Sequence, residues 1–173
     1  MAVNLEAPEQ LLPVPGVRVG SACAGIKYQQ RRDLALFSFV DATEIAGVYT
    51  RSHFAAAPVL LARARQHHSR AWVVNSGNAN AATGKPGEED AALVCAHAAR
   101  LLQIPDTEVQ PYSTGVIGER LPVGKMNEGL DAAYAALAED GWLDAARAIM
   151  TTDTVAKGIS RQVQLDGKTI TIT

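Results

Sequence analysis

The stretch Pro111-Tyr-Ser-Thr-Gly-Val-Ile-Gly118 decides how the rest of the chain is arranged. A polar segment of extended pattern precedes it, and helical spacing begins directly after it, at Leu121. Its small residues let backbone N–H groups approach a ligand, and Gly115 and Gly118 stand where a tight turn requires positive φ. A strand, a small-residue loop and a helix in this order predict a place that holds an anion or a developing oxyanion. The same composition is also that of an ordinary connecting loop.

The hydrophobic pattern on both sides of this stretch predicts an α/β protein. Short apolar or alternating runs predict strands at Val17–Gly20, Ser21–Ile26, Leu34–Val40, Ile45–Thr50 and Ala71–Asn75. Helical spacing predicts helices over Ala57–His67, Glu88–Leu102, Pro122–Leu137 and Trp142–Met150. In the second helix Leu93, Ala96 and Arg100/Leu101 mark one stripe, which we expect to face the core. Alternation around Asp166-Gly167 predicts a hairpin over residues 161–173.

Composition limits the class of protein and its partners. With 47% hydrophobic and 20% charged residues, the chain can bury a core, and we expect one α/β domain over residues 1–173. The net charge is -2 and basic residues cluster only at Arg31-Arg32, which argues against nucleic acid or an anionic membrane as partner. With no apolar run of transmembrane length and no signal-peptide pattern, a cytoplasmic protein is expected. Cys23 and Cys95 form no CxxC motif and could pair only if folding brought them together, so two buried thiols are expected.

The sequence shows no set of side chains that could carry out catalysis on its own. The four histidines lack the spacing of a metal site, no G-x-S-x-G elbow is present, and no carboxylate pair stands out. The features that indicate function are three loops of small polar residues, at Asn75–Gly84, Ser113–Gly118 and Met150–Thr154. Asn78 and Asn80 either donate hydrogen bonds to a ligand or close Asx-turns. Such loops suit binding and electrostatic stabilisation better than the supply of a nucleophile.

Three motifs, taken together and in order, resemble one enzyme family. Asn75-Ser-Gly-Asn-Ala-Asn-Ala-Ala-Thr-Gly84, Ser113-Thr-Gly-Val-Ile-Gly118 and Ile149-Met-Thr-Thr-Asp-Thr154 are similar to segments of the ornithine acetyltransferase (glutamate N-acetyltransferase) family of arginine biosynthesis. Ala24-Gly-Ile-Lys27 and Lys157-Gly158 also fit. The similarity runs from about residue 16 to Thr173. Three long motifs in the expected order are far more specific than a single glycine pattern.

The resemblance implies the layered α/β fold of self-processing N-terminal-nucleophile enzymes, the ornithine acetyltransferase/aminopeptidase-like type. Precursors in this family cut themselves before a threonine, which becomes the nucleophile at the start of a separate β chain. The present chain resembles the α chain, so the nucleophile and the family's substrate lysine are expected beyond Thr173. An α2β2 heterotetramer is implied. If the last strand pairs with the β chain, the isolated α chain should be inactive and partly unstable.

The resemblance also assigns residue roles and a reaction. Thr114 and Gly115 match the family's oxyanion-hole pair, and Thr151 matches a substrate-contacting threonine, with Thr152 as its neighbour if the register shifts by one. Ala156 departs from the family, whose members commonly have proline there. The implied reaction is a ping-pong transfer of the acetyl group from N2-acetylornithine to glutamate through an acyl-enzyme. No metal or bound organic cofactor is needed, and acetyl-CoA, which some members use, stays open as a co-substrate.

Other functions remain open at this level. One is a related self-cleaving aminopeptidase or amidase, or an acetyltransferase of secondary metabolism, because an oxyanion hole serves any acyl transfer. Another is a non-catalytic amino-acid-binding module without a catalytic partner. The simplest alternative is an α/β protein whose loops only connect its elements.

Overall fold

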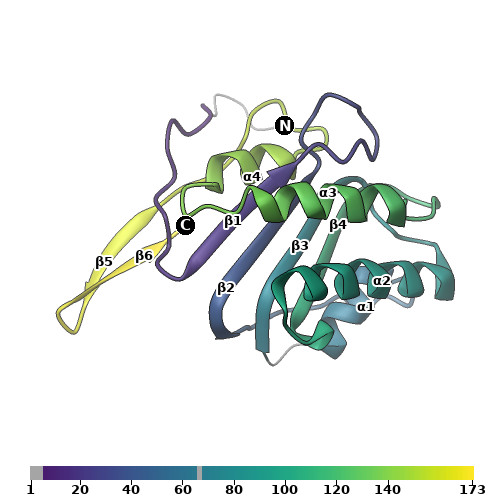
Figure 1. Ribbon diagram of the computed structural model, residues 1–173, viewed down its shortest axis with the longest axis horizontal. Coiled ribbons are helices and arrows are strands. Elements are labelled where there is room, and N and C mark those ends of the chain that lie inside the picture. Colours follow the sequence, from purple (N-terminus) through teal and green to yellow (C-terminus); the bar gives the residue numbers. More distant parts are fainter. Residues whose placement is uncertain (1–5, 66–67) are drawn as a thin grey trace.

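The computed structural model describes residues 6–65 and 68–173, which form a mixed α/β fold around a four-stranded sheet (Figure 1). In chain order the elements are β1 (Val17–Ala22), β2 (Leu34–Glu44), α1 (Ala57–Ala64), β3 (His68–Asn78), α2 (Gly84–Leu102), the 3-10 turn η1 (Asp106–Glu108), β4 (Val109–Val116), α3 (Val123–Ala135), α4 (Trp142–Ala148), β5 (Arg161–Leu165) and β6 (Lys168–Ile172). No helix among the described residues is both long enough and apolar enough to cross a membrane.

The strands of the main sheet lie in the order β1-β2-β3-β4. Strand β2 is antiparallel to both β1 and β3, whereas β3 and β4 run parallel, so a crossover must join β3 to β4. That crossover contains α2, the longest helix. Because β3 and β4 are parallel, their carboxyl ends meet at one edge of the sheet, where Ser76 pairs with Thr114 and Gly77 with Gly115.

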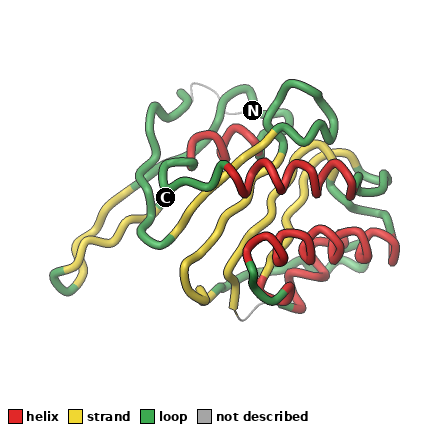
Figure 2. Tube along the Cα trace, in the orientation of Figure 1, coloured by secondary structure: helices red, strands yellow, loops and turns green. Residues whose placement is uncertain are grey.

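Helices α2 and α3 cover one face of the sheet, and the main core lies between them and the strands (Figures 1 and 2). The buried stripe of α2 consists of Ala91, Val94, Cys95, Ala98 and Ala99. The predicted stripe through Leu93 was therefore wrong, since the Leu93 side chain is 56% exposed. The small buried residues let α2 lie close to the sheet, and the packing of the whole helix overrides the position of one leucine.

On the opposite face, α4 packs its alanines against β1 and β2, with Trp142 beside Val19 and Ala35. Further along this face Trp72 contacts Phe39, with ring centroids 5.0 Å apart and nearly perpendicular rings. The position of α4 matters for function, because its last residue leads into the third of the small-residue loops.

The hairpin of β5 and β6 forms a sheet of its own and extends away from the main body (Figure 1). Asp166 and Gly167 have φ values of 50° and 75°, as a type I′ turn requires, so the predicted hairpin is confirmed. The apolar side chains of both strands are exposed, including Leu165 and Ile172. Pairing of this hairpin with a second chain stays a prediction.

Several predicted boundaries move. Residues 45–50 form no strand but an irregular segment, and the strand predicted for 71–75 extends to Asn78. The stretch from Val17 to Ile26 contains a single strand that ends at Ala22, which places Cys23 in an exposed loop rather than in the core. Helix α2 starts at Gly84, four residues before the predicted start at Glu88, because Pro86 is tolerated in the first turn of a helix. Helix α1 ends at Ala64, and the His67 predicted as its end lies outside the described residues.

Candidate active site

The meeting ends of β3 and β4 form the floor of the candidate site. Ser113 donates a hydrogen bond of 2.6 Å to the side-chain oxygen of Asn75 on the side of the sheet that α2 and α3 cover. Since side chains alternate between faces of a strand, Thr114 lies on the other side, where it lines a cleft. Its hydroxyl makes no hydrogen bond with any of the residues that the structure describes. It is therefore free to donate to a ligand.

Gly115 is held directly against the neighbouring strand, and only glycine fits this position. Its φ of 135° is one that residues with a side chain rarely adopt. A Cβ atom on Gly115 would lie 2.6 Å from the amide nitrogen of Asn78 and 2.7 Å from the carbonyl oxygen of Gly77. The expectation of a positive φ at Gly115 is thus confirmed, together with its cause, a close approach of two backbones.

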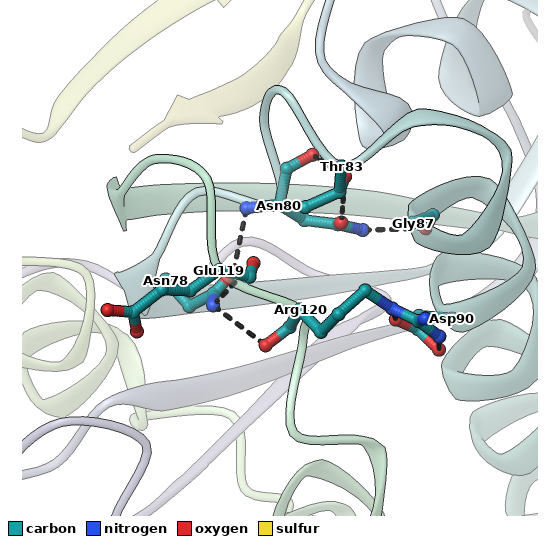
Figure 3. A network of polar contacts seen from close by, with 7 residues as sticks. All are labelled: Asn78, Asn80, Thr83, Gly87, Asp90, Glu119 and Arg120. Atoms are coloured by element: carbon teal, nitrogen blue, oxygen red, sulfur yellow. Dashed lines mark hydrogen bonds and ion pairs between the residues drawn. The ribbon is translucent and has the colours of Figure 1, made fainter.

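Two buried asparagines fix the segments that follow β3 and β4 (Figure 3). The side-chain amide of Asn78 donates to the carbonyl oxygens of Glu119, at 3.2 Å, and Arg120, at 3.1 Å. Its side-chain oxygen accepts a hydrogen bond of 2.7 Å from the backbone N–H of Asn80. Of the two interpretations left open by the sequence, the turn-closing one holds for Asn78, because its polar atoms are used within the protein.

The second asparagine and an ion pair attach these loops to α2 (Figure 3). The Asn80 amide donates to the carbonyl oxygen of Gly87 at 2.8 Å, and its side-chain oxygen accepts from the Thr83 hydroxyl at 2.8 Å. The guanidinium of Arg120 binds both carboxylate oxygens of the buried Asp90, at 2.5 and 2.7 Å. This two-point contact anchors the segment that follows β4 to the helix.

The loop after α4 forms another wall of the cleft that Thr114 lines. The Ser76 hydroxyl donates to the carbonyl oxygen of Ala148 at 2.7 Å, and Arg31 donates to the carbonyl oxygens of Met150 and of Thr151, the latter at 3.3 Å. These contacts bring residues 150–152 to the cleft.

A carboxylate stiffens the same loop from within. Asp153 accepts a hydrogen bond of 3.3 Å from the backbone N–H of Thr151 and one from the ammonium of Lys157. The hydrogen bond from Lys157, followed by that from the Thr151 amide, holds the pKa of Asp153 below its ordinary value. The carboxylate is therefore charged, and able to hold the loop, at neutral pH.

The loop between β1 and β2 closes the remaining side. The buried Asp33 accepts hydrogen bonds from the backbone N–H groups of Ala24, at 2.6 Å, and Ile26, at 2.7 Å. The ammonium of Lys125 donates to the carbonyl oxygen of Gly25 at 2.8 Å. A loop held in this way presents the next two side chains, Lys27 and Tyr28, at the rim of the cleft.

These parts enclose a cleft of about 320 Å³. Its lining includes all three residues singled out from the sequence, Thr114, Gly115 and Thr151, as well as Thr152. Lys27, Ser76 and Met150 also line it, and they belong to segments that the sequence singled out without giving them roles of their own. Sequence reasoning missed Tyr28, Arg31 and Asp33 as lining residues. The signal for Asp33 was available, since an aspartate at the end of a polar loop, directly before the apolar start of a strand, is typical of a residue that closes the loop. Among the described residues, no group of three or more His, Cys, Asp or Glu side chains could hold a metal ion.

The fold and cleft together define the class: a layered α/β chain of the N-terminal-nucleophile type, with a polar cleft at the ends of two parallel strands. A family model, the ArgJ family, matches residues 18–173, and the chain belongs to this family.

Two solved structures are similar over most of the chain. The ornithine acetyltransferase of Mycobacterium tuberculosis, solved in complex with ornithine, is 34% identical, with a TM-score of 0.80 over 91% of this chain and 86% of its own. The arginine biosynthesis bifunctional protein ArgJ of Bacillus halodurans is 31% identical, with a TM-score of 0.74 over 92% of this chain and 84% of its own. The family predicted from the three motifs is thereby confirmed.

Proposed function

We propose that this protein is an acetyltransferase of arginine biosynthesis, which moves the acetyl group of N2-acetylornithine to glutamate. The observation that carries the proposal is the convergence of Thr114, Gly115 and Thr151 on one cleft, although they come from segments far apart in the sequence. Membership of the ArgJ family and the ornithine-bound relative support the choice of substrate.

In the proposed reaction this chain stabilises charge, and a second chain attacks. The N-terminal threonine of a β chain, cut from the same precursor, adds its hydroxyl oxygen to the acetyl carbonyl of N2-acetylornithine, while its own α-amino group takes the proton. The carbonyl oxygen becomes an oxyanion that accepts hydrogen bonds from the Thr114 hydroxyl and the Gly115 N–H. Collapse of this intermediate breaks the C–N bond, and the α-amino group returns the proton to the departing ornithine. The amino group of glutamate then attacks the acyl-enzyme in the same way and releases N-acetylglutamate.

Thr151 contacts the substrate in this scheme, from the loop after α4. The proposal includes a cytoplasmic α2β2 assembly and no metal or bound organic cofactor. Acetyl-CoA can act as a second acetyl donor only if the carbonyl oxygen of its thioester reaches the same oxyanion hole. Its use is therefore tested separately.

The test replaces Thr114 by alanine in the full precursor and measures acetylglutamate formed from acetylornithine and glutamate, with and without acetyl-CoA. Loss of one oxyanion donor is expected to lower kcat by about 10²–10³-fold. Folding should be unaffected, since the exposed side chain has no hydrogen-bond partner among the described residues. Thr107 is exposed in η1, just before the start of β4 and away from the cleft end of that strand, and Thr107→Ala is the matched control. Unchanged turnover in Thr114→Ala would reject the assignment, and hydrolysis of acetylornithine without acetylglutamate would favour an amidase instead.

A further inference from the structure

The backbone of Leu12 is held by two hydroxyls, one from each end of the β5–β6 hairpin. Its N–H donates to the Ser160 hydroxyl at 2.8 Å, and its carbonyl oxygen accepts from the Thr173 hydroxyl at 2.7 Å. The two hydroxyl oxygens lie 2.9 Å apart. Because the Thr173 hydroxyl already donates to Leu12, the Ser160 hydroxyl must be the donor between them. These three residues therefore form a closed ring of hydrogen bonds, the Leu12 latch, in which every donor has an acceptor.

The residue beside this latch attaches it to the main body. The buried Leu11 packs against Ala146 of α4 and Ala156 of the loop that follows α4. Met150, which lines the cleft, packs against the same cluster. A Cβ atom on Gly158 would lie 2.8 Å from Cδ1 of Leu11, so a residue without a side chain makes room for the leucine. The segment before β1 thus connects the base of the hairpin to the loop that forms a wall of the cleft.

The direction of the hairpin depends on how its base is held. Strands β5 and β6 form a sheet of their own that extends away from the main body (Figure 1). A two-stranded hairpin is at best marginally stable by itself in water. Ser160 directly precedes β5, and Thr173 directly follows β6. By binding both of them, the backbone of Leu12 fixes the two strands at once.

The place from which the chain leaves the hairpin matters in the proposed function, because there the β chain follows this chain in the precursor. In self-cleavage, water is added across the peptide bond before the nucleophilic threonine, which leaves a carboxylate on one side and a free α-amino group on the other. The rate of an intramolecular reaction depends on how closely its groups are held in the reactive geometry. Since Thr173 is bound to Leu12, the segment that follows it starts from a defined place relative to the cleft wall.

We propose that the Leu12 latch positions the precursor for self-cleavage. Ser160 and Thr173 hold the hairpin through Leu12, so that the peptide bond to be cut reaches the cleft. This inference rests on the proposed function. Ser160 and Thr173 are positioning residues, because neither of them lines the cleft. After the cut, the threonine is the free end of a separate chain, and its contacts in the cleft set its position. Loss of the latch should therefore slow cleavage and leave the turnover of the processed enzyme nearly unchanged.

The test follows cleavage of the full precursor after cell-free synthesis, with the ratio of uncut to cut chains read from intact mass over time. Loss of one net hydrogen bond in Ser160→Ala or Thr173→Val should slow cleavage by roughly 2–10-fold. The double variant should be little slower than either single variant, because one loss already opens the ring. Thr173→Ser keeps the hydroxyl and should cleave at nearly the wild-type rate.

Thr169→Val is the matched control within the same hairpin. It removes a hydroxyl that accepts a hydrogen bond of 2.8 Å from the side-chain amide of Gln164, close to the turn and away from the latch. Because this hydroxyl does not contact the main body through Leu12, the variant should cleave at the wild-type rate. Acetylglutamate formation by the processed fraction of each variant is measured alongside, so that effects on cleavage and on turnover are separated.

Several results would overturn the inference. An unchanged cleavage rate in both single variants would mean that the ring only supports the fold. Equal slowing in Thr169→Val, or an equal loss of turnover in the processed enzyme, would assign the effect to the stability of the hairpin or of the whole fold. The proposed function fails separately. If the wild type cleaves but forms no acetylglutamate, the acetyltransferase is rejected, and the cleavage rates still decide on the latch. A wild-type precursor that never cleaves would reject both self-processing and the latch.

Discussion

Gly115→Ala is the change that tests the architecture of the cleft most directly. The added methyl group would lie 2.6 Å from the amide nitrogen of Asn78 and 2.7 Å from the carbonyl oxygen of Gly77. Both are backbone atoms within paired strands, so neither can turn aside as the end of a flexible side chain would. The φ of 135° adds a second penalty, because alanine disfavours it.

The size of the effect follows from these two terms. A positive φ costs a residue with a Cβ atom about 1–2 kcal/mol, and overpacking costs about 1–3 kcal/mol more. We expect a loss of roughly 2–5 kcal/mol, a large part of the 5–15 kcal/mol typical of a whole domain. Relief of the clash must shift strand β4, which displaces the Gly115 N–H and should lower kcat by about 10²–10³-fold.

Gly118→Ala is the matched control. Gly118 also has a positive φ, of 85°, but apart from its two chain neighbours no atom of the described residues lies within 4 Å of the position of its Cβ. Only the backbone term of about 1–2 kcal/mol applies to it. Urea unfolding at one protein concentration and the acetylglutamate assay should separate the two variants on both measures. If Gly115→Ala loses no more stability than Gly118→Ala, then β3 and β4 do not make a close backbone contact at Gly115.

Three further outcomes are expected. Asn78→Ala should lower the free energy of unfolding by about 1–3 kcal/mol, since buried partners lose their hydrogen bonds; urea unfolding measures it, and a neutral result would contradict the network. Burial raises the pKa of Cys95 to about 11, so a thiol reagent near pH 8 should label Cys23 quickly and Cys95 only in denaturant, as located by peptide mass. The hydrogen bond from Lys157 lowers the pKa of Asp153, so the order that this carboxylate gives its loop is present above the ordinary value of 3.8 and is lost as the pH falls through the lowered one. Amide exchange of residues 150–154, corrected for intrinsic rates, should speed up in that acid range, and Asp153→Asn should exchange fast already at neutral pH.

The sequence predicted the elements whose signals are local. The Asp166-Gly167 turn depends only on its own two residues and on the alternation of the residues beside them. The glycines at the end of β4 likewise indicate directly that the backbone there has a positive φ. The stripe of α2 could not be obtained in this way, because its rotation is set by contacts with α3 and the sheet rather than by its largest apolar residue.

The residues that form the sides of the cleft could not be predicted from local sequence patterns, for a similar reason. Arg31 and the residues it holds are 119 and 120 positions apart in the sequence, and nothing in either segment indicates the other. The roles of Thr114, Gly115 and Thr151 came from a resemblance between motifs. Those roles stay predictions, while the structure shows that the three residues share one cleft.

The structure shows which small polar residues of the motifs already form hydrogen bonds within the protein. The hydroxyls of Ser76, Ser113 and Thr83 each donate to a partner within the protein, so they support the loops. The hydroxyls of Thr114 and Thr151 line the cleft without such a partner among the described residues. A polar group that the fold leaves unpaired in a cleft has its hydrogen-bonding capacity available for a ligand. Because Ser113 and Thr114 are neighbours in one motif and all five residues are small and polar, composition could not separate the supporting hydroxyls from the free ones, and the hydrogen-bond pattern does.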